Sequence, residues 1–242
     1  MDSDEISATP DSVDMAKLSL PELDAEALTE DLALALLSHS DLAPEIIQKI
    51  VKNTDVMKSR KVRLAVAAHP RTARRVSLRL IRESYTGDLA RFALLPAVAA
   101  DLRKAAAELL LTRLPSITLG ERISLARRSP ATVAAALLLD KESRVWQAAL
   151  ENPRLTEVAI VNMLRRPGAS DTLVTFLCRS AKWSTRPEIR VALLLNEKTP
   201  LTHAMALART LPPEQLRDIL HASRLPKNVK AHLEETALDE MP

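Results

Sequence analysis

The sequence predicts an all-α fold assembled from pairs of short helices, and three observations lead to that prediction. Leucine and alanine supply most of a hydrophobic content of 47%, whereas aromatic residues make up only 2% of the chain. Three glycines leave few of the flexible residues that tight β-hairpin turns require. One apolar segment with a polar end also recurs along the chain, which is typical of helical repeats.

The recurring segment is clearest in residues 61–72, which read KVRLAVAAHPRT, and related segments follow 83 and 127 residues later. In the later copies Asn152 and Asn196 occupy the position of His69. We expect each copy to be a helix that ends at a polar corner. His69 is expected to form a local hydrogen bond at its corner and is not expected to be a ligand or a base.

Prolines mark the expected corners, because proline is tolerated in the first turn of a helix but not in its interior. A second internal match relates residues 114–133 to residues 211–229. The spacing of the corner prolines gives a repeat of about 23 to 30 residues. These prolines are Pro44, Pro70, Pro130, Pro153, Pro200 and Pro226.

At the amino terminus, residues 1–20 have little apolar periodicity and are expected to be a disordered acidic tail. A first helix is expected from Pro21, where an acid follows at the positive end of the helix dipole, to Leu37. The polar residues 38–41 end this helix, and Pro44 opens the second helix of the first pair.

The helical-repeat domain is expected to span residues 21–234 and to be followed by an acidic tail at residues 235–242. The irregular turn at residues 167–171 either divides two stacks of helices or lengthens one loop. The pair of helices that begins near residue 61 should bury two apolar stripes. Their members are Val62, Ala65 and Val66 in the first helix and Val76, Leu80 and Ile81 in the second.

The corner segments resemble those of the leucine-rich repeat variant and related HEAT-like families. The residues that carry the resemblance are Val62-Arg63-Leu64-Ala65 with Ala68-His69-Pro70, Ala148-Ala149-Leu150-Glu151-Asn152-Pro153, and Ile189-Arg190-Val191-Ala192. The resemblance implies a right-handed α-solenoid of armadillo type that acts as a recognition scaffold, and it names no ligand. Some leucine-rich variants carry an amino-terminal cysteine cluster, which is missing here, so no iron–sulfur role carries over.

Charge is distributed unevenly along the chain, although the formal net charge is only +3. Residues 1–31 contain ten acids and one base, whereas residues 32–233 carry a net charge of +16. A run from Lys58 to Arg82 has nine basic residues and no acid. Most of the run forms an expected basic face, which comprises Arg60, Lys61, Arg63, Arg71, Arg74, Arg75, Arg79 and Arg82.

Two interpretations of the basic face stay open. It is either a solvated surface or a binding face for an anionic partner, such as nucleic acid, an acidic protein or a membrane surface. Arg71, Arg75, Arg79 and Arg82 have the spacing of one side of a helix. Nucleic acid would be held by its phosphates, because no aromatic residue within the basic run offers a platform for base stacking.

Catalytic and metal-binding patterns are missing from the sequence. Cys178 is the only cysteine and is expected to be a small buried hydrophobe, so no disulfide and no thiolate cluster is expected. Three isolated glycines provide no phosphate loop, and no His-Glu-x-x-His motif occurs. Trp146 and Trp183 are interpreted as packed side chains or, alternatively, as interface anchors. No cofactor is expected.

The sequence therefore favours a non-catalytic scaffold that binds an unidentified protein partner, for which an acidic partner is one candidate. Sequence-nonspecific nucleic-acid binding is the alternative, and a HEAT-like DNA glycosylase is a more remote one. The amino terminus lacks the pattern of a signal peptide and no run is long enough to span a membrane, so a cytoplasmic location is expected. The acidic tail is either a solubilising cap or an autoinhibitory segment that competes for the basic face.

Overall fold

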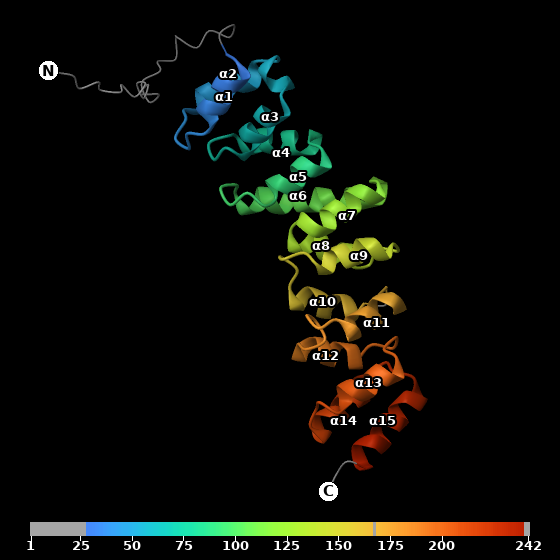
Figure 1. Cartoon of the computed structure of the whole chain (residues 1–242). Helices are drawn as coiled ribbons and strands as arrows, with labels where there is room; N and C mark the ends of the chain where they lie inside the picture. The colour runs from blue at the N-terminus through green and yellow to red at the C-terminus, as the bar shows by residue number, and fades with distance from the viewer. Residues whose placement is uncertain (1–27, 167, 240–242) are drawn as a thin grey trace, which may run out of the picture. The chain divides into compact units, whose positions relative to one another are not determined.

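The computed structural model describes residues 28–166 and 168–239, and within these ranges it contains helices and no strand, which confirms the all-α prediction (Figure 1). In these described ranges, the 3-10 helices η3 (Val56–Lys58) and η4 (Leu114–Ser116) accompany the α-helices. The α-helices are α1 (Glu30–Leu37), α2 (Pro44–Lys52), α3 (Arg60–Ala68), α4 (Arg74–Glu83), α5 (Thr86–Phe92), α6 (Ala100–Arg113), α7 (Leu119–Arg128), α8 (Ala131–Leu137), α9 (Ser143–Leu150), α10 (Glu157–Leu164), α11 (Asp171–Arg179), α12 (Pro187–Leu194), α13 (Leu201–Ala208), α14 (Pro213–Ala222) and α15 (Lys227–Asp239).

The described residues divide into two compact units, where the sequence predicted a single domain over residues 21–234. The first unit contains residues 28–84 and 95–102, and the second contains residues 85–94, 103–166 and 168–239. The division falls near α5 and α6, so the irregular turn around Gly168 lies inside the second unit and lengthens a loop there. Pro167 itself lies outside the described residues, as does the predicted tail over residues 1–20.

In the first unit, α3 packs against both α1 and α4. Both predicted stripes face the interior: Val62 and Val66 of α3 are fully buried, and Leu80 and Ile81 of α4 are nearly so. Ala65 and Val76 are only half-buried. Aliphatic side chains thus make this core, as the composition predicted.

The first helix starts later than predicted. Thr29 has an extended backbone, and its Oγ1 accepts a hydrogen bond from the backbone N–H of Leu32 at 3.3 Å. This cap satisfies one of the free N–H groups at a helix start and therefore fixes the start of α1 at Glu30. A continuous helix from Pro21 to Leu37 is consequently wrong, and residues 21–27 lie outside the described part.

In the second unit, helices pack against the helix two positions along the chain. The packed pairs include α7 with α9, α8 with α10, α10 with α12, α12 with α14, and α13 with α15. Prolines stand at the corners as predicted: Pro130 and Pro200 cap α8 and α13, while in the first unit Pro44 is the first residue of α2. The predicted acidic tail at residues 235–242 begins inside α15, which continues to Asp239.

The corner residues in the three copies make matching hydrogen bonds. The Oδ1 atoms of Asn152 and Asn196 each accept the backbone N–H two residues ahead, at 2.9 Å in both cases. Their Nδ2 groups reach back to earlier helix ends: Asn152 donates to the carbonyl oxygen of Ala126 at 2.8 Å and Asn196 to that of Leu164 at 2.7 Å. Each buried amide thus ties its corner to a neighbouring pair of helices.

His69 does the same with an imidazole ring. Its Nδ1 accepts the backbone N–H of Arg71 at 3.2 Å, and its Nε2 lies 2.9 Å from the carbonyl oxygen of His39. With the ring proton on Nε2, both contacts are hydrogen bonds. The predicted local bond is therefore confirmed, and the ring also contacts the corner between α1 and α2, which the sequence did not predict.

Candidate functional site

A groove of about 530 Å³ runs between α2 and α4 of the first unit. The α2 side contributes Ile47, Gln48, Val51 and Lys52 among others. The opposite side is formed by the corner before α4 and by α4 itself, through Arg71, Thr72, Ala73, Arg75, Val76 and Arg79. Residues of two helices and of the corner between α3 and α4 thus line one groove.

The rim of the groove is cationic. Lys52, Arg71, Arg75 and Arg79 are exposed lining residues, and no acidic residue is among the residues that line the groove. Arg75 also lies in the first turn of α4, where no side chain caps the helix and where the helix dipole is positive. A cation at this position is electrostatically unfavourable on its own, and a bound anion would relieve the repulsion.

The floor of the groove is apolar. Ile47 of α2 is almost completely buried, and Val51 and Val76 are half-buried beside it. An apolar floor below a cationic rim fits a ligand that presents carboxylates on one side and aliphatic groups on the other. A bare phosphate backbone would use the rim alone.

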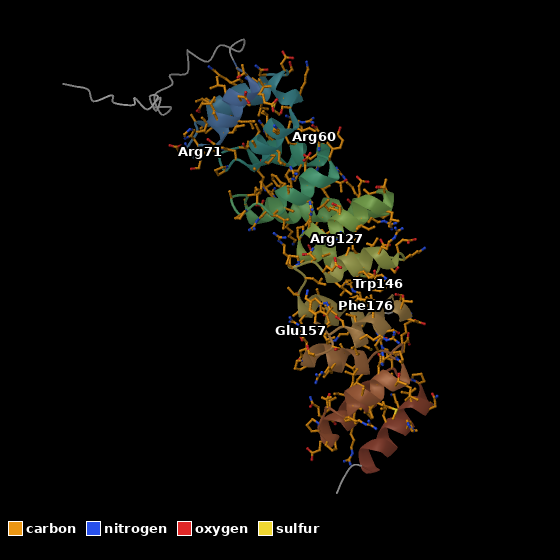
Figure 2. All side chains as sticks on the ribbon, viewed as in Figure 1. Arg60, Arg71, Arg127, Trp146, Glu157 and Phe176 are labelled. Carbon is orange, nitrogen blue, oxygen red and sulfur yellow. The ribbon has the colours of Figure 1, made fainter. Side chains whose placement is uncertain are left out.

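The structure separates the predicted basic residues into groups. Arg71, Arg75 and Arg79 line the groove, whereas Arg60, Lys61 and Arg63 belong to α3 and are not among its lining residues. Figure 2 shows Arg60 and Arg71 at different sides of the first unit. One expectation is corrected here, because α4 begins at Arg74, so Arg71 lies in the corner before the helix and not on it.

The other two predicted residues lie on α4 outside the groove. Arg74 donates through Nε to Oδ2 of Asp101 at 2.7 Å, and this hydrogen bond holds the pKa of the Asp101 carboxyl below its usual value. The charge of Arg74 is thereby partly balanced within the first unit. Arg82 lies near the end of α4 and does not line the groove.

Lys52 is a groove residue that the sequence did not single out. It lies in the last turn of α2, where Asp55 separates it in sequence from the basic run. Its place at the rim depends on the position of α2 across the groove from α4, which a count of charges along the chain does not reveal. The signal that could have identified Lys52 is its position as a cation in the last turn of the helix that precedes the basic run.

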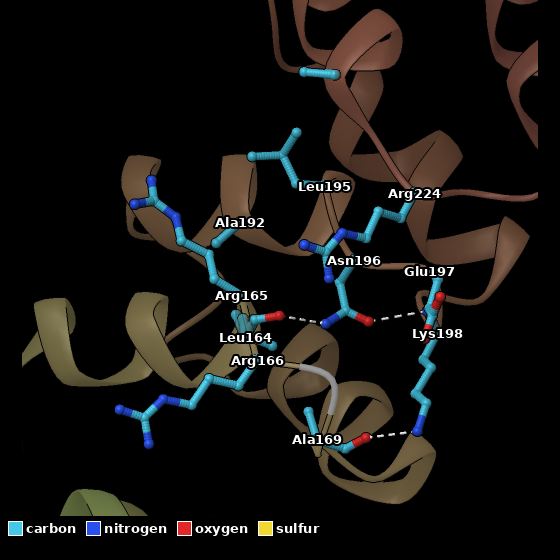
Figure 3. Close-up of a pocket in the computed structure, with 11 residues that line it drawn as sticks. Leu164, Arg165, Arg166, Ala169, Ala192, Leu195, Asn196, Glu197, Lys198 and Arg224 are labelled. Carbon is cyan, nitrogen blue, oxygen red and sulfur yellow. Dashed lines mark hydrogen bonds between the residues drawn. The ribbon is translucent and has the colours of Figure 1, made fainter.

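A second cavity, of about 240 Å³, lies in the second unit around Asn196 (Figure 3). Several cations surround it, but Figure 3 shows the guanidinium groups of Arg165 and Arg166 extending away from that of Arg224. Lys198 instead donates to the carbonyl oxygen of Ala169 at 2.8 Å. The cations therefore do not converge on one point, and the cavity reflects the packing of a corner.

The two tryptophans are core side chains. Trp146 is 3% exposed and packs edge-to-face against Phe176, with 5.3 Å between the ring centroids (Figure 2). Trp183 is 2% exposed, and the side chains of Lys182 and Arg186 lie over its ring. Both indoles stabilise the second unit, and neither exposes a ring as an interface anchor would.

The described residues were also compared for clusters of metal-binding side chains and for a membrane-spanning helix. Within residues 28–166 and 168–239, no group of three or more His, Cys, Asp or Glu side chains is placed to hold a metal ion. Cys178, which was expected to be a small buried hydrophobe, is half-buried, and this burial raises the pKa of its thiol to about 11. In the same described ranges, no helix has both the length and the apolar character to cross a membrane.

Comparisons of this chain with protein-family models, curated proteins and solved structures found no match. The function of the candidate site is therefore inferred from its geometry and charge.

Proposed function

We propose that this chain is a non-catalytic binding protein that holds an acidic segment of a partner protein in the groove between α2 and α4. The observation that carries the proposal is the combination of four exposed cations with an apolar floor and no acid in one groove. Opposite charge gives specificity and speeds association, and the apolar floor adds affinity that is insensitive to salt.

The proposed architecture is an α-solenoid of stacked two-helix repeats of the leucine-rich variant or HEAT-like kind. Two features support it: the related corners at His69, Asn152 and Asn196, and the packing of most helices in the second unit against the helix two positions along. Two-helix units bury both apolar stripes only by stacking, and the resulting surfaces commonly serve recognition.

Nucleic acid is the second candidate, because the run from Lys58 to Arg82 is basic throughout. The acidic protein segment is favoured over it, since Lys61 and Arg63 lie on a helix that does not line the groove. The groove also offers no aromatic side chain for base stacking. The glycosylase alternative has less support, because the residues that line the groove include no carboxylate or histidine to act as a general base.

The test compares two charge-reversed forms of the full chain at low ionic strength. The groove variant is Arg75→Glu with Arg79→Glu, and the control is Lys61→Glu with Arg144→Glu, which changes the net charge equally at exposed residues outside the groove. The ligands are a labelled peptide in which glutamate alternates with leucine, and mixed-sequence DNA and RNA. Fluorescence anisotropy measures binding.

The groove variant should bind the peptide at least about tenfold more weakly than the control does, because two attractions become repulsions. Equal weakening in both variants would show that only net charge matters and would contradict a groove site. Tighter binding of DNA or RNA than of the peptide, with the same loss in the groove variant, would replace the proposal with phosphate binding.

A further inference from the structure

We propose that His69 is a positioning residue of the groove, which holds Arg71 where an acidic ligand pairs with it. The inference depends on the proposed function, because it takes Arg71 to be a contact of the acidic segment. The hydrogen bond that carries the inference runs from the backbone N–H of Arg71 to Nδ1 of His69, at 3.2 Å. Through this bond, a buried ring that is not among the lining residues acts on a residue that is.

The corner between α3 and α4 takes its shape from His69. Two residues of this corner, Arg71 and Thr72, line the groove. The backbone N–H of Arg71 donates to the ring, and that of Thr72 donates to the carbonyl oxygen of His69 at 3.1 Å. The Oγ1 of Thr72 donates to the carbonyl oxygen of Val66 at 2.7 Å. Because a corner has no helix ladder to fix its backbone, these bonds set the position from which the Arg71 side chain extends.

The ring is itself anchored towards the other side of the groove. Its Nε2 lies 2.9 Å from the carbonyl oxygen of His39, in the corner that leads from α1 to α2. Pro44, the first residue of α2, is a lining residue on that side. His69 thus links the segments that precede both groove helices, and it fixes the place of Arg71 relative to α2.

A comparison with the second unit shows that Arg71 is available to a ligand. There, Asn196 is followed two residues later by Lys198, a cation in the same place relative to its corner. The Nζ of Lys198 donates to the carbonyl oxygen of Ala169 at 2.8 Å and lies 3.3 Å from Oδ1 of Asp171. Among the described residues, none forms a hydrogen bond or ion pair with the exposed guanidinium of Arg71. The related corner therefore presents its cation outward in the first unit.

Two conservative replacements separate the two contacts of the ring. The side-chain oxygen of asparagine takes about the place of Nδ1, and Asn152 and Asn196 use it to accept the N–H two residues ahead. Glutamine is one methylene longer, so its side-chain nitrogen reaches the place of Nε2 but leaves no acceptor at that of Nδ1. His69→Asn should therefore keep the bond to Arg71, and His69→Gln should lose it.

The test measures binding of the labelled peptide of alternating glutamate and leucine to full-length variants, by fluorescence anisotropy at low ionic strength. His69→Gln should weaken binding about threefold, because Arg71 is no longer held at the rim, whereas His69→Asn should keep the affinity of the unmodified chain. Asn152→Gln, the matched control in the second unit, should also leave the affinity unchanged. Equal affinities of the two His69 variants, or an equal loss in the control, would overturn the inference.

A charge reversal at residue 71 gives a readout that a loss of stability does not imitate. In the Arg71→Glu chain, residue 71 repels the acidic peptide, so release of its backbone by His69→Gln should relieve the repulsion and tighten binding about twofold. A destabilised unit would instead bind more weakly in both backgrounds. Unchanged or weaker binding on adding His69→Gln to the Arg71→Glu chain would therefore contradict a positioning role.

Amide exchange in the unmodified chain tests the same coupling, even where circular dichroism shows that His69→Gln does not fold. Because coupling is reciprocal, saturating peptide should stabilise the bond of the Arg71 N–H and slow its deuterium exchange at least about twofold, while exchange of the Arg154 N–H stays unchanged. Unchanged exchange at Arg71 would overturn the inference.

The outcomes also separate this inference from the proposed function. Peptide binding that is lost on Arg75→Glu with Arg79→Glu, but is equal in the unmodified chain and in both His69 variants, would overturn the positioning role and leave the proposed function standing. Failure of the unmodified chain to bind the peptide would overturn both.

Discussion

At the scale of single residues, His69 shows how a ring substitutes for an amide. Its two nitrogens meet the backbone N–H of Arg71 and the carbonyl oxygen of His39, the same kinds of partner that Asn152 and Asn196 bind. His69 is 5% exposed, so water does not readily replace a lost contact. The burial of the His69 ring and its two contacts with backbone groups favour a structural role for this side chain.

Replacement of His69 tests this role. His69→Ala leaves a buried carbonyl and a backbone N–H without their side-chain partner and should lower the free energy of unfolding by about 1 to 3 kcal/mol. His69→Asn restores the amide of the other corners and should lower it by less than about 1 kcal/mol. Urea unfolding followed by circular dichroism measures both, and equal losses in the two variants would contradict the shared corner chemistry.

Cys178 provides a second test at this scale. Burial raises the pKa of its thiol from 9.0 to about 11, because a thiolate is poorly solvated there. At neutral pH the reactive thiolate should then be about a hundredfold rarer than in an ordinary cysteine. The rate of reaction with a disulfide reagent should be correspondingly slow and should rise with pH up to about 11, and it should approach that of a free thiol once the chain is unfolded. Fast labelling of the folded chain at pH 7 would contradict the burial.

At the scale of helices, α7 illustrates how local sequence fixes a helix start. Thr118 accepts the backbone N–H of Glu121 at 3.3 Å, and the carboxylate of Glu121 accepts the backbone N–H of Thr118 at 3.0 Å. These reciprocal bonds satisfy two N–H groups at the helix start. The bonds from Thr118 also lower the pKa of Glu121.

Removal of this cap should weaken the second unit, because α7 packs against both α8 and α9. Thr118→Ala should reduce the free energy of unfolding by about 1 kcal/mol. The folded pKa of Glu121 lies below the unfolded value, so its contribution is complete above the unfolded pKa and is lost as the pH falls through the folded pKa. Unfolding measured at pH 7 and again at pH 3 should therefore show a smaller effect of Thr118→Ala at pH 3, and an effect that is independent of pH would contradict the role of the carboxylate.

Helices and corners could largely be predicted from the sequence, because their signals are local. Proline at helix starts and the shared position of His69, Asn152 and Asn196 are visible without a structure. The predicted start of the first helix was wrong because the sequence contains two valid start signals, Pro21 followed by an acid and the capping residue Thr29. Periodicity alone does not show which of the two begins the helix.

The candidate site could be predicted only in part, because tertiary packing assembles it. The basic run identified Arg75 and Arg79, but Lys52 joins them from another helix. Asp101, which is 27 residues from Arg74 in sequence, lies within 2.7 Å of it and partly balances its charge. The division into two units likewise depends on contacts that charge and periodicity do not encode.

At the scale of the whole molecule, the central claim is that charge and apolar surface act together in one groove. The groove has a cationic rim formed by Lys52, Arg71, Arg75 and Arg79, and no acidic residue is among the residues that line it. A solvated basic surface would attract any anion in proportion to net charge and would be screened by salt. A groove that pairs particular carboxylates with particular arginines should distinguish ligands that differ only in the sign of those charges.

A charge-swap titration tests this claim most directly. The acidic peptide LSLPELDAEA and its reversed form LSLPKLKAKA are titrated into the unmodified chain and into the Arg75→Glu, Arg79→Glu variant, and anisotropy gives the four affinities. Direct pairing predicts that the unmodified chain prefers the acidic peptide and that the variant prefers the basic one, each by at least about tenfold. An unchanged order of preference in the variant would contradict the account, because it would mean that these two arginines do not contact the ligand.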